Sequence, residues 1–521
     1  MSKRIIVDPV TRIEGHLKIE VEVENGVVKD AWSSGTMYRG FEKLLEQRSP
    51  FDAPYITSRF CGICFSVHTM ASVKALEDAY GATVPDGGRI MRNLLMGAEY
   101  LYDHILHFYH LSALDYIDIM AVTGYSGKDA DLLAVKEKIA GLVERSDAHP
   151  LTPRYEPDEY SVSDPETVTT LVKHYLDALH WQMAFKKLGA IFGGRAPHYR
   201  SIIPGGVTQI PSDDQIAQFR QLLTEGLAFV REVYALDVMA VGTGPLLPLA
   251  QSGFGQGHTR YMAYGAFEQG ASNEMLLTPG VITGDLTEVQ EVDESLITES
   301  VANAWYKDAN PVHPYLGEQD VDRDKENAYS FIKAPRYNGQ AMEVGPLARM
   351  LVMQNADLMQ LVNDGVQPGV VARHASRAIE SLIIADAMEQ WIEELETAMA
   401  GENFAIHTPI DQSTPDAMQG AGFYDAPRGA LGHWVQLDDA KIQRYQAVVP
   451  STWNASPRDE AGVRGQYEES LIGVPVPDTD NPINVVRVIR SFDPCLACAV
   501  HMIHPVTNEI KKYAIDPVMG V

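Results

Sequence analysis

Cysteine is scarce in this chain, which has only four in 521 residues. They form two pairs, Cys61 with Cys64 near the N-terminus and Cys495 with Cys498 near the C-terminus. Disulfide-stapled proteins carry many cysteines in a short chain, so this composition excludes a disulfide scaffold. A chain of this length can bury a large core without cross-links. The two CxxC pairs therefore need another explanation.

Basic residues are also few, because 42 lysines and arginines stand against 70 aspartates and glutamates, a formal net charge of −28. Nucleic acids and anionic membrane surfaces need a cationic face, so the balance argues against both as partners. No apolar run reaches the roughly 18 residues of a membrane-spanning helix. The N-terminus, MSKRIIVDPVTRIEGH, lacks the apolar stretch of a secretory signal. The chain alone predicts a cytoplasmic protein, although one exported already folded on a partner's signal would look the same.

Helical periodicity dominates the middle of the sequence. We expect helices over residues 89–119, 164–194, 212–238, 341–363 and 373–400. Asp164-Pro165 supplies an N-cap and a first-turn proline for the second of these, and Gly193-Gly194 ends it. Long helices that are apolar over much of their surface favour a bundle core.

Strands are expected mainly near the N-terminus. Residues 17–24 alternate apolar and polar side chains, and Asn25-Gly26 then favours a type I′ turn, which predicts a hairpin. Residues 250–340 and 402–480 are richer in turn formers and indicate loops with short strands. We therefore predict an α+β fold that is mostly α, with a long central helix bundle, small peripheral hairpin or sheet lobes, and one compact body.

Both cysteine pairs have the spacing of metal ligands. A CxxC turn lets two thiolates meet one metal, and two such pairs make a four-thiolate site that suits zinc, copper, nickel or Fe–S clusters. A structural zinc site usually takes its pairs from within one small module, which disfavours zinc here without excluding it. Redox-active pairs also stay open, although no thioredoxin-like βαβ pattern surrounds either pair. If one metal site uses both pairs, both chain ends converge on it.

Several motifs then resemble one family. The segments RFCGICFSVH (59–68) and SFDPCLACAVH (491–501) resemble the paired signatures of the large, catalytic subunit of [NiFe] hydrogenases. Six further blocks follow in family order: VTRIEGH (10–16), MYRGFE (37–42), YDHILHFYHL (102–111), GGRAPHYRSIIPGGV (193–207), YDAPRGALGHW (424–434) and VVPSTWNASPRD (448–459). The membrane-associated, periplasmic uptake type is the most similar.

The resemblance implies a binuclear Ni–Fe centre. Cys61 and Cys495 would be terminal nickel ligands, and Cys64 and Cys498 would bridge nickel and iron. The iron would carry CO and cyanide. Because position 495 is cysteine, the resemblance is not to the selenocysteine variant. The implied activity is the reversible heterolytic cleavage of H2 to protons and electrons.

The resemblance also assigns catalytic roles. Glu14 would be the proton gate beside Cys495, since a carboxyl on a flexible stem can swing between acceptors. Arg428 would stand over the open metal position, oriented by Asp103 and Asp493.

Further positions would shape the pocket of the metal centre. Pro427 would help to form it, Ser451 would donate to a cyanide ligand, and Leu431 would give an apolar wall. His68 would hydrogen-bond a bridging thiolate.

Other positions carry weaker implications. Glu42, His501 and the Ala447 carbonyl would bind a nearby Mg²⁺, although histidine is an unusual magnesium ligand. Ile63 and Leu111 would line the last constriction of the gas channel, and isoleucine at the first position predicts a narrower gate. The third feature is a row of histidines at positions 104, 107 and 110, for which we expect a packed or interfacial helix face rather than a second metal.

The resemblance also implies partners and processing. Residues 1–501 would form the body, and a specific endopeptidase would remove residues 502–521 after His501. No cysteine remains for an electron relay, so an Fe–S small subunit is needed, and a membrane cytochrome b or another acceptor would take the electrons. The small subunit's export signal would place the enzyme in the periplasm or at the membrane. A cytoplasmic or H2-sensing large subunit, a respiratory-complex-like subunit without Ni–Fe, and a zinc scaffold are the alternatives.

Overall fold

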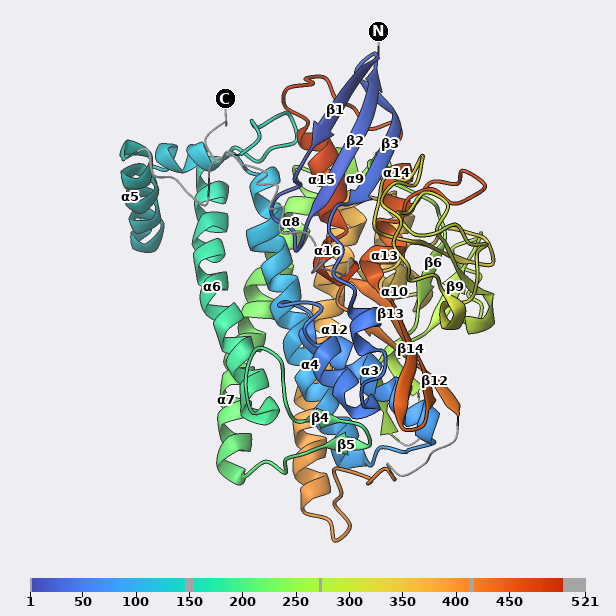
Figure 1. Cartoon of the computed structure of the whole chain (residues 1–521). Helices are drawn as coiled ribbons and strands as arrows, with labels where there is room; N and C mark the ends of the chain where they lie inside the picture. The colour runs from blue at the N-terminus through green and yellow to red at the C-terminus, as the bar shows by residue number, and fades with distance from the viewer. Residues whose placement is uncertain (1, 146–150, 152–153, 271–273, 412–416, 500–521) are drawn as a thin grey trace.

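The computed structural model describes residues 2–145, 151, 154–270, 274–411 and 417–499 of the chain (Figure 1). The structure confirms a mostly helical fold with several small sheets. The α-helices are α1 (Phe41–Leu45), α2 (Ala53–Thr57), α3 (Phe65–Tyr80), α4 (Asp86–Leu106), α5 (Ala130–Glu144), α6 (Pro165–Gly193), α7 (Asp213–Phe229), α8 (Ala235–Thr243), α9 (Leu247–Gln251), α10 (Pro346–Val352), α11 (Ala356–Asn363), α12 (Val370–Met399), α13 (Pro450–Asn454), α14 (Gln466–Leu471), α15 (Ile483–Ser491) and α16 (Leu496–Ala499).

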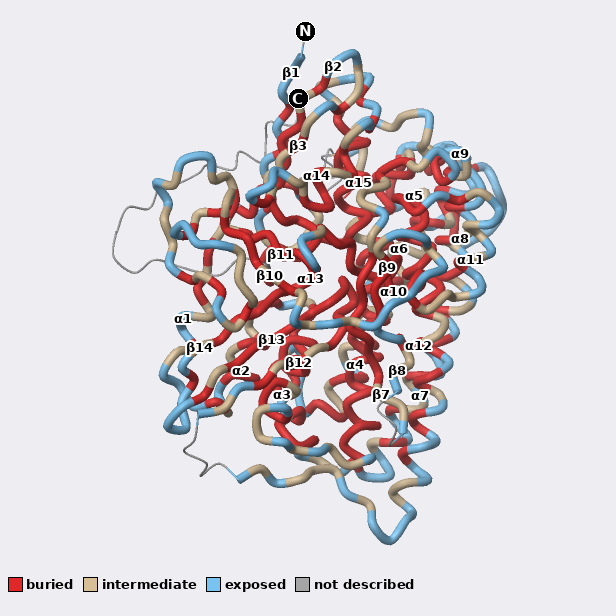
Figure 2. The backbone as a smooth tube through the Cα atoms, turned by 90° about the vertical axis from the view of Figure 1, so that its right-hand side faces the viewer, coloured by how far each residue is buried: buried red, intermediate tan, exposed pale blue. Residues whose placement is uncertain are grey.

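The longest helices pack side by side around α4. Helix α4 contacts α6 on one side and α12 on another, while α7 packs on α6 and α8 on α12 (Figure 1). Residues 87–105 of α4 are all buried (Figure 2). A helix enclosed on every side needs apolar or paired side chains around its whole circumference. Any charged residue between positions 87 and 105 must therefore meet a partner in the interior.

Three predicted helices differ from the expectation. The segment 212–238 spans α7, a π-helical turn at Val230–Tyr234 and the start of α8. The segment 89–119 is not one α-helix, because α4 ends at Leu106 and a π-helical turn, His107–Ser112, follows it. Such turns are frequent at functional sites, because the wider turn changes which residues share a face. The segment 341–363 contains two short helices, since Gln354 adopts a positive φ of 51° and breaks the run.

The predicted N-terminal hairpin is confirmed. Strands β2 (Leu17–Glu24) and β3 (Val27–Gly35) pair antiparallel across Asn25 and Gly26, whose φ values of 54° and 76° fit the type I′ turn. Strand β1 (Lys3–Val7) pairs with the outer edge of β2. The chain leaves β1 and passes through residues 8–16 before β2 begins.

The expectation of short strands over residues 402–480 was wrong for its central part. Strands β12 (Met418–Ala426), β13 (Gly429–Asp438) and β14 (Lys441–Val448) form an antiparallel sheet of long strands. Helix α3 lies on β12. A Cβ atom at Gly422 would stand 2.0 Å from the Ala71 carbonyl oxygen of α3. The glycines that lowered the strand signal are therefore the ones that let the helix approach.

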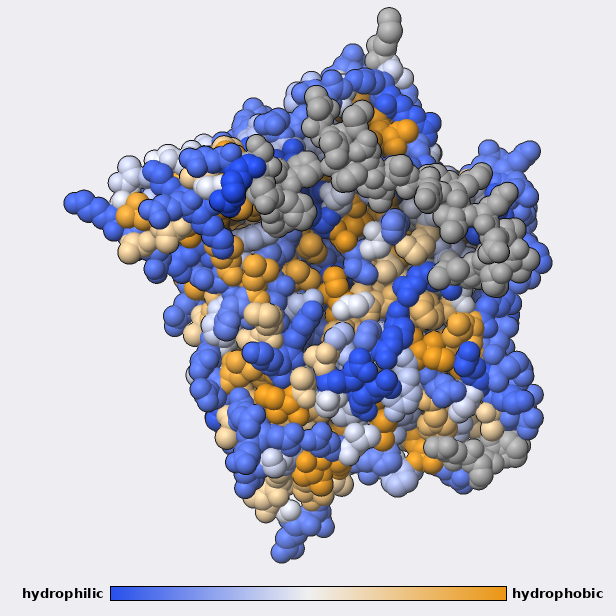
Figure 3. Space-filling model, turned by 60° about the vertical axis from the view of Figure 1, so that its left-hand side comes forward, coloured by the Kyte–Doolittle hydropathy of each residue, from blue (hydrophilic) through white to orange (hydrophobic). Residues whose placement is uncertain are grey.

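The remaining strands are short and form separate ladders. The pairs are β4 (Ile202–Ile203) with β5 (Gly206–Val207), β6 (Tyr261–Ala263) with β9 (Gly280–Ile282), β7 (Ala266–Gln269) with β8 (Glu274–Leu277), and β10 (Ile297–Ser300) with β11 (Ala334–Tyr337). Within the described ranges, no helix is both long and apolar enough to cross a bilayer. On the face in Figure 3, apolar side chains form separate groups among hydrophilic ones.

Candidate metal centre

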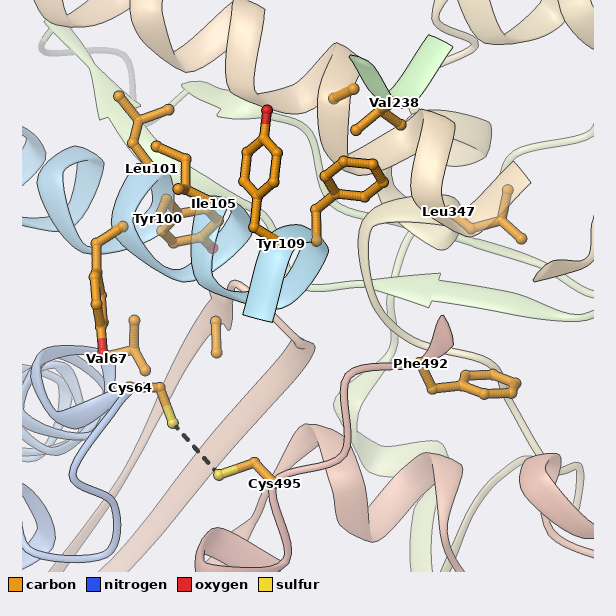
Figure 4. Packing of buried hydrophobic residues seen from close by; sticks show 14 of the residues in the cluster. Cys64, Val67, Tyr100, Leu101, Ile105, Tyr109, Val238, Leu347, Phe492 and Cys495 are labelled. Carbon is orange, nitrogen blue, oxygen red and sulfur yellow. Dashed lines mark hydrogen bonds between the residues drawn. The ribbon is translucent and has the colours of Figure 1, made fainter. Parts of the chain in front are cut away.

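The two cysteine pairs meet in the interior. Cys61 Sγ lies 3.3 Å from Cys495 Sγ, and Cys64 Sγ lies 3.3 Å from Cys498 Sγ. All four sulfurs lie within 4.8 Å of one another, and all four residues are buried. Figure 4 shows Cys64 and Cys495 pointing toward each other from segments at opposite ends of the sequence. The predicted convergence of both chain ends on one buried site is therefore confirmed.

The N-terminal pair precedes a long helix. Cys64 occupies the N-cap position of α3. The carboxyl group of Glu99, from α4, accepts hydrogen bonds from the backbone N–H groups of Ser66 at 3.0 Å and Val67 at 3.3 Å. Burial, with the charge of Asp103 nearby, raises the pKa of Glu99 to about 8. Sequence reasoning missed Glu99, although an acid inside an apolar helix is a signal that it needs a partner.

The C-terminal pair is held by the N-terminal segment. The Glu14 N–H donates to the Pro494 carbonyl at 3.2 Å, and the Leu496 N–H donates to the Glu14 carbonyl at 2.6 Å. The Cys495 N–H donates to Ser451 Oγ at 2.9 Å. The backbone of Glu14 thus forms a β-bridge with Cys495. Predicted residues Glu14 and Ser451 both lie at this pair.

A buried cation stands beside the cysteines. Arg428 Nη1 donates to Asp103 Oδ2 at 2.9 Å, and Nη2 donates to Asp493 Oδ1 at 3.0 Å. All three side chains are buried. Burial, the neighbouring Asp493 and Cys61 outweigh the attraction of Arg428 and raise the pKa of Asp103 to about 7. The carboxylates keep Arg428 charged, since its pKa is raised well above the ordinary value despite burial.

Glu14 also faces the charged groups of the site. Burial first, and then the charge of Cys61, raises the pKa of Glu14, while Arg428 and Arg39 oppose that rise. A carboxyl with a raised pKa can take up and release a proton nearer to neutral pH than an exposed one. The side chain therefore has the environment that a proton carrier needs.

A buried hydrogen-bonded chain reaches Cys498 from the other side. His68 Nε2 lies 3.3 Å from Cys498 Sγ, and His68 Nδ1 lies 3.3 Å from His433 Nε2. His433 Nδ1 continues to the Tyr445 hydroxyl at 2.7 Å, which donates to Ser72 Oγ at 2.9 Å. Sequence reasoning placed His68 correctly beside a cysteine. It missed His433 and Tyr445, although His433 lies within the YDAPRGALGHW block.

The remaining pocket residues also lie in the interior. Leu431 is fully buried in the same apolar cluster as the cysteines. The Pro427 carbonyl accepts a hydrogen bond from Arg349 Nη2 at 2.9 Å. That bond fixes the backbone just before Arg428.

The predicted magnesium ligands are only partly described. Burial raises the pKa of Glu42 to about 7, although Lys333 opposes the rise. Ala447 is buried on β14, paired with His433 of β13. His501 lies outside the described residues, so the set of three ligands is not tested.

Ile63 and Leu111 are the two residues predicted to line the gas channel. Ile63 packs against the main core, and Leu111 lies in the π-helical turn, where its carbonyl accepts from Arg12 at 2.9 Å.

The three histidines at positions 104, 107 and 110 contact three different partners. His104 Nε2 meets Glu380 at 2.8 Å, His107 Nε2 donates to the Arg490 carbonyl at 2.7 Å, and His110 Nε2 donates to the Tyr175 carbonyl at 3.1 Å. Among the described residues, the four cysteines are the one group with metal-ligand geometry.

Comparison with known proteins agrees with this geometry. The family model for nickel-dependent hydrogenase matches residues 39–501, and a HoxL-like model matches residues 4–33. The chain is 39% identical to the periplasmic [NiFeSe] hydrogenase large subunit of Desulfomicrobium baculatum, over 98% of both chains. It is 34% identical to the hydrogenase-2 large chain of Escherichia coli K12, over 98% of this chain and 99% of that one.

A solved structure has the same fold. The reduced Ni-Fe-Se hydrogenase of D. vulgaris Hildenborough superposes with a TM-score of 0.84 at 38% identity, covering 96% of this chain and 100% of that chain. The fold and the four-thiol site together define the large, catalytic subunit of a hydrogenase, an oxidoreductase that acts on H2. The chain belongs to the nickel-dependent hydrogenase family.

Proposed function

We propose that Cys61 and Cys495 are terminal nickel ligands and that Cys64 and Cys498 bridge nickel to an iron carrying CO and cyanide. The observation that carries this proposal is the four buried sulfurs within 4.8 Å of one another. Thiolates are soft ligands that suit nickel and iron. When bound, the centre supplies the heterolytic cleavage of H2. Zinc is disfavoured as the occupant because a charged arginine with two carboxylates adjoins the thiols, which a structural site does not need.

The proton released from H2 would leave through Glu14. Its backbone adjoins Cys495, and burial raises the pKa of its side chain. Arg428, held by Asp103 and Asp493, would place a fixed positive charge beside the reacting position, where it stabilises developing negative charge. Because both carboxylates are buried, the guanidinium has few other orientations available.

Ser451, Leu431 and Pro427 would shape the space for the diatomic ligands. Ser451 Oγ accepts the Cys495 N–H, and its hydroxyl would donate to a cyanide ligand. His68 would hold the sulfur of Cys498, with its far nitrogen fixed by His433. Ile63 and Leu111 would line the last constriction of the gas channel, and isoleucine at the first position would narrow it.

A magnesium ion would bind Glu42, the Ala447 carbonyl and His501. The raised pKa of Glu42 supports this, because a buried carboxyl gains most from a cation that compensates its charge. Cleavage after His501 would leave residues 1–501 as the mature body. The family match ends at residue 501, which is consistent with that boundary.

The enzyme would work with an Fe–S small subunit, since all four cysteines are used by one centre. A membrane cytochrome b or another acceptor would take the electrons. The small subunit's export signal would carry the pair to the periplasm or the membrane. The relative from Desulfomicrobium baculatum named as periplasmic supports this location.

One sample of the purified heterodimer tests the assignment. Elemental analysis is expected to give one nickel per heterodimer, with iron in excess of nickel because the Fe–S clusters of the small subunit add iron of their own. Infrared spectroscopy is expected to give bands for CO and cyanide. Zinc without nickel, or nickel without those bands, would overturn the assignment.

A further inference from the structure

Arg39 connects the two cysteine segments through their backbones. Its Nη1 donates to the Phe60 carbonyl at 2.7 Å and to the Ala497 carbonyl at 3.0 Å, while Nη2 donates to the Arg59 carbonyl at 3.0 Å. The carbonyls of Arg59 and Phe60 directly precede Cys61. The Ala497 carbonyl lies between Cys495 and Cys498.

The arginine is clamped in place for this contact. Its guanidinium lies over the Phe41 ring, 4.6 Å from the ring centroid, which restricts the plane of the fork. A planar guanidinium offers donors in a rigid arrangement, so one side chain can bind acceptors from two segments at once. Hydrogen bonds from a charged donor are also stronger than neutral ones. A lysine at this position would keep the charge but not the fork.

The contact differs in kind from the one that His68 makes with the C-terminal pair. His68 meets the sulfur of Cys498, and sulfur is the atom that a metal would bind. Arg39 instead meets main-chain oxygens, which stay available whether or not a metal is present.

We infer that Arg39 is a positioning residue that draws the C-terminal cysteine segment onto the N-terminal one and sets the distance between the pairs. The inference goes beyond the proposed function, because it concerns how the four sulfurs come together and holds for any metal that they bind. Arg39 would connect the two distant pairs before any metal binds.

The test measures how fast each cysteine of the metal-free, full-length chain reacts with iodoacetamide, resolved by mass spectrometry. In Arg39→Gln, we expect Cys495 and Cys498 to react about tenfold faster relative to Cys61 and Cys64, because the C-terminal segment separates more often. Arg59→Gln is the matched control. Within the part of the chain that the structure describes, the hydrogen bond that this side chain donates goes to Ser58 Oγ, and its substitution leaves the Arg59 carbonyl in place.

An unchanged ratio in Arg39→Gln would overturn the inference. So would an equal acceleration of all four cysteines, because that pattern reports general loosening. If Arg39→Gln fails to fold, Arg39→Lys decides, with an expected rise of the same ratio by a smaller factor and an unchanged melting temperature. Metal analysis tests the proposed function separately, so the two can fail independently.

Discussion

The two cysteine pairs are built in different ways. The N-terminal pair opens α3, and Glu99 of the neighbouring helix α4 binds the first N–H groups of α3. The C-terminal pair lies at the short helix α16, with Cys495 just before it and Cys498 within it, and contacts from residues far away in the sequence hold it. Glu14, Ser451 and Arg39 make these contacts.

This difference indicates an order of assembly. The N-terminal pair stands at the start of a long helix whose first N–H groups are already hydrogen-bonded. It can take its position as soon as the helices around α4 pack. A pair held by distant backbone contacts can be placed only when those segments are already in position, since each contact closes a long loop. We therefore expect the N-terminal pair to form the platform and the C-terminal pair to dock on it.

The largest expected effect is on catalysis. It tests whether the side chain of Glu14 carries protons, apart from the role of its backbone in holding the C-terminal pair. Glu14→Gln keeps the backbone bridge to Cys495 but removes the proton carrier. We expect the rate of H2 oxidation in the heterodimer to fall by about 10²- to 10⁴-fold. The infrared bands of the diatomic ligands should stay in place, and Glu24→Gln, an exposed change on β2, should have no effect. Activity near the wild-type rate would remove Glu14 from the proton route.

The next prediction concerns a substitution that should weaken the packing of the C-terminal pair on the N-terminal pair. A Cβ at Gly15, whose φ is +85°, would stand 2.3 Å from the Ala497 amide nitrogen. Strain and overpacking together cost about 3 kcal/mol. Gly15→Ala should therefore raise the alkylation of Cys495 and Cys498 in the metal-free chain by about a hundredfold.

Gly62→Ala, at the N-terminal pair, is the control for Gly15→Ala. A Cβ at Gly62, between the cysteines of the N-terminal pair, would meet nothing within 4 Å. Gly62→Ala should leave alkylation of all four cysteines near the wild-type rates. Equal effects of the two substitutions would contradict the difference between the pairs.

A third prediction concerns the platform alone. Glu99→Leu would leave the Ser66 and Val67 N–H groups buried without an acceptor, and should lower the free energy of unfolding by about 3 kcal/mol. Glu99→Gln keeps an acceptor and should lose much less. Thermal or denaturant unfolding of the two variants measures the difference, and equal losses would contradict the capping role.

The same residue predicts a dependence of stability on pH. Glu99 keeps its proton up to about pH 8 when folded but loses it near pH 4.3 when unfolded. Folding therefore takes up a proton in this window, and the contribution of Glu99 to stability falls as the pH rises through it. Glu99→Gln should remove up to about 1.4 kcal/mol per pH unit of that fall. An identical slope in the variant would show that Glu99 is ionised in the folded chain.

The smallest expected effect is kinetic. Ile63→Val removes one methylene from the N-terminal loop and should speed inhibition of the enzyme by CO a few-fold. Ile210→Val, at an exposed position, is the control. Inhibition at the wild-type rate would exclude Ile63 from the gas route.

Local sequence patterns predicted the helix ends and turns whose structure depends on contacts between neighbouring residues. Asp164 does cap α6 by accepting the Thr167 N–H, and Asn25-Gly26 does turn the first hairpin. The prediction failed for β12, where glycines looked like loop formers. Their role is to admit the backbone of α3, a contact between distant segments that no local window contains.

Spacing and family motifs together predicted most of the candidate site. They placed the four cysteines, Arg428 with its two carboxylates, and His68 beside a sulfur. They did not reveal Glu99, His433 or Arg39, because the partners of these side chains are backbone groups or residues on other elements. Hydrogen bonds to main-chain atoms leave no sequence pattern at the accepting position.

The sequence by itself determined that this chain has four thiols in two pairs, enough for one metal centre and none for a cluster relay. It also determined the helices and the turn that depend on neighbouring residues. Only the tertiary structure decided that the pairs meet, which segments hold each one, and which charges face them. The reason is physical: burial and the approach of distant charges set the pKa values and the distances at the site, and both depend on the packing of the whole chain.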